Sequence, residues 1–144
     1  MRTPDSPGTP ELPETHWSYG FLIPHDPRAA SVVRAALRAL LRATRLGCVA
    51  DTVELLASEL VTNAYRHSPT DAYVNVERTP ETLTVSVWDH GLGCPAPSEA
   101  RQRSDDAEAG RGLGIVEACA DEWGVREYLY GKAVWFSVVP KEER

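Results

Sequence analysis

The chain has 144 residues, of which 42% are hydrophobic, enough for one domain with a sizeable core. Its formal net charge of -6 argues against a dedicated nucleic-acid-binding protein, because lysine and arginine hold the phosphate backbone. No apolar run approaches the ~18 residues that are needed to cross a bilayer. The sequence has no close CxxC pair, so it favours neither a disulfide framework nor a zinc site. We therefore expect a cytoplasmic protein that binds neither membranes nor nucleic acid.

The N-terminal part is expected to be a tail followed by a strand and a helix. Residues 1–15 are rich in proline, threonine, serine and acid, a composition that buries too little apolar surface to order itself. Large and small side chains alternate from His16 to Ile23, which predicts a strand at the edge of a sheet. Asp26 and Pro27 resemble the start of a helix, and Gly47 would end that helix as a left-handed cap.

The first helix carries a stripe of arginines opposite its apolar face: Arg34, Arg38, Arg42 and Arg45. A basic stripe of this kind is most often a solvated face. The alternative is a docking surface for an acidic partner.

The second helix carries three polar side chains inside an apolar pattern. It is predicted to start at a capping box, Asp51 to Glu54, and to end before Pro69. Glu59, Asn63 and His67 recur every four residues, so they share one face at the margin of the apolar positions. A buried carboxylate or amide is unfavourable without a partner, so a water, a metal ion or a ligand should meet them there. The alternative is an amphipathic helix whose polar residues face water.

A hairpin is predicted from two alternating stretches, residues 72–77 and 83–88, and an acidic, glycine-rich turn follows it. In Asp89-His90-Gly91-Leu92-Gly93 the carboxylate stands at the end of a strand, where it can accept a hydrogen bond from an exocyclic amine. The two glycines would let a flat ring approach the backbone closely. Alone, the pattern fits a tight turn equally well.

A second glycine cluster follows a stretch without periodicity. Gly110-Arg111-Gly112-Leu113-Gly114 would open a short helix from Leu113 to Ala120, so that unpaired N–H groups and the positive helix end face a polyphosphate. The alternative is a flexible loop end. Two further strands, Trp123 to Tyr130 and Ala133 to Val139, are predicted on either side of a turn at Gly131-Lys132.

The order of these elements is one strand, two helices, a hairpin, a long loop, a helix and a second hairpin. This order predicts an α+β fold, with the helices segregated on one face of a mostly antiparallel sheet.

Three motifs in this order resemble those of the GHKL ATPase superfamily (Bergerat fold): Glu-x-x-x-Asn on a helix, Asp-x-Gly-x-Gly after a strand, and Gly-x-Gly-x-Gly before a helix. Within it, the stretch from Glu59 to Ser68 is most similar to small stand-alone anti-sigma factor serine kinases. The resemblance covers Trp17 to Val139. It implies a two-layer α/β sandwich in residues 16–140, with about five strands covered on one face by three helices, and a short tail at 141–144.

The resemblance implies a role for each motif. Asn63 would coordinate the Mg²⁺ that bridges the phosphates of ATP, and Glu59 would act as the general base. Asp89 would recognise the adenine amino group, while Gly91 and Gly93 would make room for the base. The phosphates would be held by Gly110, Arg111, Gly112, Leu113 and Gly114.

The family likeness also implies an activity and partners. It implies a serine kinase that transfers the γ-phosphate of ATP to a serine of a STAS-type anti-sigma antagonist. The same domain would bind a sigma factor and regulate that sigma factor by partner switching. Residues 94–109 would form a lid over ATP, and a homodimer is expected. The alternative is a non-catalytic regulator whose nucleotide sets its affinity for a partner. We expect His67 to be a hydrogen-bonding group at the helix end rather than a phosphoacceptor, and Trp88, Trp123 and Trp135 to be core residues.

Overall fold

The structure is a computed structural model that describes residues 15–90 and 107–140, with the side chains of 107–112 left out. Apart from a short 3-10 helix, its helices and strands follow one another in the predicted order. The elements are β1 (Trp17–Ile23), α1 (Ala29–Ala43), the short 3-10 helix η1 (Gly47–Val49), α2 (Ala50–His67), β2 (Ala72–Arg78), β3 (Leu83–Asp89), α4 (Ala107–Cys119), β4 (Glu122–Tyr128) and β5 (Gly131–Val138).

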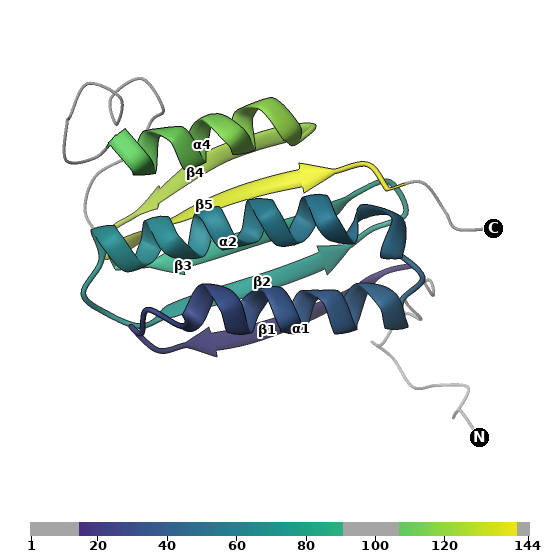
Figure 1. The fold of residues 1–144 in the computed structure, drawn as a ribbon, viewed down its shortest axis with the longest axis horizontal. Coiled ribbons are helices and arrows are strands. Elements are labelled where there is room, and N and C mark those ends of the chain that lie inside the picture. The colour runs from purple at the N-terminus through teal and green to yellow at the C-terminus, as the bar shows by residue number, and fades with distance from the viewer. Residues whose placement is uncertain (1–14, 91–106, 141–144) are drawn as a thin grey trace, which may run out of the picture.

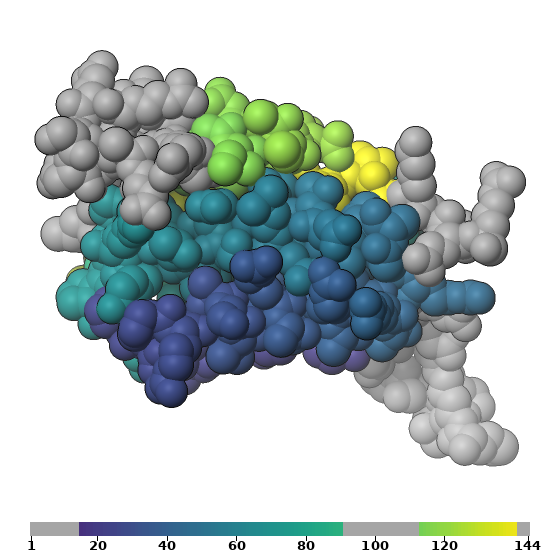
Figure 2. Space-filling view, in the orientation of Figure 1, coloured from purple at the N-terminus to yellow at the C-terminus, as the bar shows by residue number. Residues whose placement is uncertain are grey.

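The strands form one antiparallel sheet of five strands in the order β1-β2-β3-β5-β4. The helices α1, α2 and α4 lie side by side on one face of this sheet, with α2 in the middle (Figure 1). In the space-filling view they hide most of the sheet (Figure 2). This arrangement confirms the predicted α+β sandwich, and the predicted first strand does lie at an edge.

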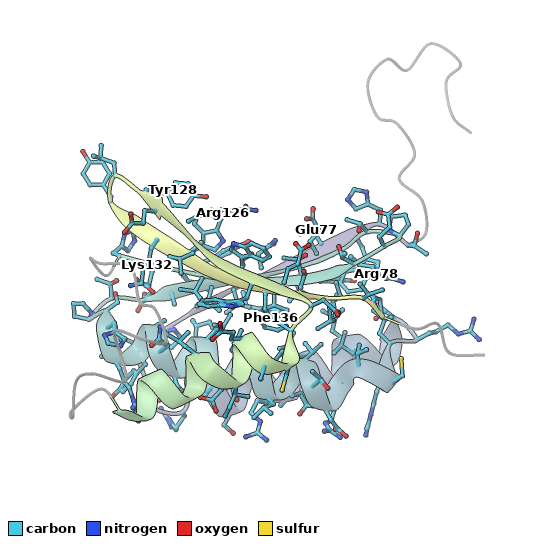
Figure 3. All side chains as sticks on the ribbon, turned by 90° about the horizontal axis from the view of Figure 1, so that it is seen from above. Glu77, Arg78, Arg126, Tyr128, Lys132 and Phe136 are labelled. Carbon is cyan, nitrogen blue, oxygen red and sulfur yellow. The ribbon has the colours of Figure 1, made fainter. Side chains whose placement is uncertain are left out.

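The core forms between the sheet and the helix layer because both contribute apolar residues at the expected period. Alternate residues of the central strands point toward the helices, and the facing sides of α1 and α2 supply Val and Leu every three or four residues. Burying one such side chain stabilises the fold by roughly 1.5–3 kcal/mol. Phe136 lies between the two layers (Figure 3). The largest of the most deeply buried side chains are Leu37, Leu41, Val53, Leu56, Leu60, Val74, Val76, Leu83, Val85, Val87, Leu113 and Phe136.

The starts of the first two helices differ from prediction. Helix α2 begins at Ala50 without a side-chain cap, because Glu54 turns into the protein and forms an ion pair with Arg38 of α1 at 2.7 Å. The predicted capping box is therefore wrong. Helix α1 begins at Ala29, two residues later than expected, although Asp26 still accepts a hydrogen bond from the backbone N–H of Arg28 at 2.7 Å.

The end of α1 also differs. The residue with a left-handed backbone is Arg45, with φ of 65°, and not Gly47, which starts the 3-10 helix. The arginine stripe is divided as well: Arg38 is held by Asp51 and Glu54, so it is not free to meet an acidic partner.

The face of the sheet away from the helices is open. Figure 3 shows Glu77, Arg126 and Tyr128 on this side. Trp88 contacts the Tyr128 ring and Trp135 lies under the Arg126 guanidinium, so these two tryptophans are half-buried on the open face and not in the core. Trp123 alone of the three packs against the core. Within residues 15–90 and 107–140, no helix has the length and apolarity to span a bilayer.

Candidate functional site

Three elements that carry predicted site residues meet strand β5 at one end of the sheet. Helix α2 and strand β3 finish there, and α4 and β5 start there (Figure 1). The register of β3 and β5 pairs Asp89 with Lys132, while α2 packs against α4. The fold therefore gathers the helix motif and the acidic motif, which lie apart in the sequence.

Asn63 is the clearest sign of a missing partner at this end. Its side chain is buried, and its Oδ1 has no hydrogen-bond partner in the described part of the chain. Leaving a buried acceptor unsatisfied costs about 1–3 kcal/mol, so an oxygen in this position points to a ligand. A carbonyl oxygen is a ligand that Mg²⁺ accepts.

The same face of α2 carries two more polar groups at helical spacing. His67, one turn after Asn63, has a buried Nε2 that also lacks a partner among the described residues, although the sequence predicted a hydrogen-bonding group there. Glu59, one turn before Asn63, is half-buried. The three side chains thus follow one another along α2, and the two nearest its C-terminal end have unsatisfied buried atoms.

Asp89 occupies the end of β3 as predicted, but it has a partner that the sequence did not suggest. Lys132 Nζ donates a hydrogen bond to Asp89 Oδ1 at 3.1 Å, and the two side chains are 2% and 1% exposed. Sequence reasoning placed Lys132 in a turn. The chain turns at Leu129 and Tyr130 instead, and Lys132 is the second residue of β5.

A signal for Lys132 was present in the sequence. Lys132, Val134, Phe136 and Val138 alternate along one face of β5, and extending the strand by two residues would have included the lysine among the buried positions. Gly131 makes the close approach possible, because a Cβ there would collide with the Asp89 backbone carbonyl. His90 Nδ1 donates to the Tyr130 carbonyl at 2.9 Å and fastens the end of β3 to this turn.

The second glycine cluster lies differently from prediction. Helix α4 begins at Ala107, so Gly110, Gly112 and Gly114 are inside the helix and do not precede it. The first four N–H groups of a helix have no partner within the helix, and in α4 they belong to residues 107–110. Leu113, expected at the phosphates, has a side chain buried in the core. Gly91, Gly93 and residues 94–106 of the predicted lid lie outside the described residues.

The sequence model of the Histidine kinase-like ATPase domain family matches residues 23–138, which include α2, β3 and α4. The chain belongs to this family. A comparison with curated proteins found no match.

Among solved structures, this histidine kinase-like ATPase domain is similar to the crystal structure of the RsbU and RsbW domains of Rv1364c from Mycobacterium tuberculosis. The TM-score is 0.66 at 19% identity, and the match covers 88% of this chain and 34% of the other. At this identity the likeness shows the fold, and the chain spans about a third of that protein's length.

The family implies ATP, usually with Mg²⁺, and the residues of this ATPase domain fit them in part. The unsatisfied Oδ1 of Asn63 suits a cation. The Asp89 carboxylate is a hydrogen-bond acceptor at the end of β3, which is the group that an adenine amine requires. The start of α4 presents the positive end of a helix.

A cavity of about 790 Å³ lies at this end of the sheet, and Asp89 and Lys132 are among the residues that line it. Side chains of the open face line it, among them Leu22, Tyr73, Trp88 and Tyr128, together with the turn between β4 and β5. Asn63, Glu59 and His67 are not part of its lining. This cavity is therefore not the place where α2 presents its polar groups.

Proposed function

We propose that the chain is an ATP- and Mg²⁺-dependent protein serine kinase of the anti-sigma type. It would transfer the γ-phosphate to a serine of a STAS-type antagonist, bind a sigma factor, and so act in partner switching in the cytoplasm. The observation that carries the proposal is the unsatisfied, buried Oδ1 of Asn63, on a helix that ends where β3 ends and α4 starts, in a chain of the histidine kinase-like ATPase family.

The binding roles follow from this arrangement. Asn63 would hold the Mg²⁺ that bridges the phosphates, and Asp89 would accept a hydrogen bond from the adenine amine. The phosphates would lie at the start of α4, where the free N–H groups of the first helical turn favour an anion. Gly91 and Gly93 would leave room for the base. Gly110 and Arg111, near the start of α4, would complete the phosphate site.

Glu59 supports a kinase in preference to simple nucleotide binding. Its carboxylate stands one helical turn before Asn63, within reach of a group attacking a metal-bound phosphate. In the transfer, the acceptor serine oxygen would form a bond to the γ-phosphorus as the bond to the bridging oxygen of ADP breaks. The proton of the serine hydroxyl would pass to Glu59, and positioning would supply most of the remaining rate.

The choice of partners rests on likeness. The stretch from Glu59 to Ser68 resembles anti-sigma kinases, and the solved structure described above contains domains named RsbU and RsbW. The open face of the sheet, with exposed Leu22, Tyr73 and Tyr128, supports the expectation of a homodimer.

Incubation with γ-labelled ATP, Mg²⁺ and candidate STAS-type antagonists from the same genome tests the proposal. A labelled serine on an antagonist is the expected result. ATP binding that changes affinity for a partner, with no label transferred, would instead support the non-catalytic regulator. Absence of ATP binding by calorimetry would reject both functions.

A further inference from the structure

The pair formed by Asp89 and Lys132 is the feature least explained by the fold. The nitrogen and the oxygen are 3.1 Å apart, and neither side chain is more than 2% exposed. Taking two charges out of water costs several kcal/mol per ion, and apolar side chains of similar volume at such positions are often as stabilising or more so. Packing alone therefore gives no reason for a lysine opposite this aspartate.

The pair also leaves donors unused. A lysine ammonium carries three N–H groups. Within residues 15–90 and 107–140, Asp89 is the acceptor found for Lys132, which leaves two N–H groups without one in that part of the chain. Buried donors are normally paired, so an acceptor from outside the protein fits here.

The two side chains together present a definite pattern. Directly opposite each other on neighbouring strands, they place a hydrogen-bond acceptor and a donor side by side on the helix face of the sheet. The edge of adenine carries the complementary pattern, since its exocyclic amine donates and the adjacent ring nitrogen N1 accepts. Guanine carries the reverse, with an accepting oxygen beside a donating N1–H.

We propose that Lys132 is a specificity-determining residue that donates a hydrogen bond to N1 of adenine while Asp89 accepts from the neighbouring amine. This inference rests on the proposed binding of ATP at this end of the sheet. Because the hairpin and Gly131 hold both groups in place, the base meets a preformed pair. A site built to bond a particular group rejects an analogue that lacks it, since the protein group is then left unpaired.

The test compares ATP with 1-deaza-ATP, in which a C–H group replaces N1, by calorimetry with Mg²⁺. The parent protein should bind ATP about 10- to 100-fold more tightly, the range expected when one buried polar group loses its partner. Lys132→Met should bring the ratio of the two affinities close to one. Arg126→Met is the matched control, because it removes a cation from the same hairpin on the open face, and it should keep the parent ratio (Figure 3).

The ratio is measured within each protein, so a general loss of stability does not imitate the effect. If Lys132→Met does not fold, the double variant Asp89→Asn with Lys132→Met leaves no unpaired buried charge, and its ratio should also be close to one. A parent that binds both nucleotides equally, or a variant that keeps the parent ratio, would overturn the inference and leave ATP binding standing. A parent that binds neither nucleotide would reject the proposed function itself.

Discussion

Asn63 destabilises the fold unless a ligand binds to its side-chain oxygen. Its Oδ1 is buried without a partner among the described residues, and one turn later His67 Nε2 is in the same condition. Two such atoms on one helix face are more than packing requires, because buried polar groups are nearly always satisfied. The site is therefore expected to be less stable without nucleotide than an apolar surface of the same shape.

Asn63→Leu tests this directly. Without nucleotide the variant should melt at or above the Tm of the parent, because it removes an unsatisfied acceptor worth about 1–3 kcal/mol. It should also lose the rise in Tm that Mg²⁺ and ATP give, which is about 2.7 kcal/mol of stabilisation at 100 times Kd. Asn75→Leu, on the open face, is the control that should keep the nucleotide response. A normal response in Asn63→Leu would contradict the metal-binding role.

Glu59→Gln separates binding from catalysis. The variant should bind ATP as the parent does, since the side chain is proposed to act on the acceptor hydroxyl. Phosphoryl transfer should fall about 10²- to 10⁴-fold, the usual contribution of a general base. Glu81→Gln, exposed in the turn between β2 and β3, serves as the control. Equal transfer rates in Glu59→Gln and the parent would show that Glu59 is not the base.

Asp89→Asn has two effects that need separate measurements. ATP affinity should fall about tenfold or more, because a hydrogen bond to a charged group contributes about 1.5–3 kcal/mol. The free energy of unfolding should also drop, by about 3–5 kcal/mol, since Lys132 is left as a buried charge without its partner. Calorimetry below the measured Tm isolates the binding effect. Asp51→Asn, at an exposed carboxylate, should leave ATP affinity unchanged, and unchanged affinity in Asp89→Asn would refute the adenine assignment.

At the scale of elements, α1 and α2 are joined by charges as well as by apolar packing. Arg38 of α1 lies 2.7 Å from Glu54 and 3.0 Å from Asp51 of α2. The contact with the Glu54 carboxylate raises the pKa of the Arg38 guanidinium above its ordinary value, with a smaller contribution from Asp51. The helix that carries Asn63 is thus fixed to its neighbour at its first turns, away from the proposed ATP site.

Arg38→Met should lower the Tm, because it leaves the buried Glu54 carboxylate without its counter-ion. The double variant Arg38→Met with Glu54→Gln should recover part of the loss, since it removes the unpaired charge. Arg42→Met, on an exposed position of the same helix, should have little effect. Thermal unfolding of the four proteins gives the comparison, and a double variant no more stable than Arg38→Met would contradict a pairwise role.

At the scale of the whole molecule, the two faces of the sheet differ in their exposure to solvent. The helices cover one face (Figure 1), so its apolar side chains are buried, while Tyr128 projects from the other face (Figure 3). Leu22, Tyr73 and Tyr128 are all exposed. An exposed apolar surface of this kind marks an interaction site in many soluble proteins. A homodimer formed through the sheet would cover it.

Tyr128→Arg should shift a dimer toward monomer, because it places a charge in the apolar surface. Light scattering across a concentration series measures the change. Val32→Arg, at an exposed position on α1, is the control and should leave the assembly unchanged. A parent that stays monomeric at high concentration would rule out the dimer.

Local sequence patterns determined the elements and the broad architecture. An antiparallel sheet with helices on one face could be predicted from three local patterns. These are the alternation in β2 and β3, the period of the apolar residues in α1 and α2, and the position of β1 before Pro24. They also placed Glu59, Asn63 and His67 on one helix face, because that follows from helical spacing alone.

Tertiary structure decided which of these polar groups lack partners and which have them. Glu54 forms an ion pair with Arg38 and does not cap α2. Asp89 accepts a hydrogen bond from Lys132, a residue 43 positions away. The register between β3 and β5 brings that pair together, and register depends on the packing of the whole sheet and not on local sequence. Asn63 was a candidate from the sequence because of its spacing. Only burial, with no partner for its oxygen among the described residues, made it the centre of a site.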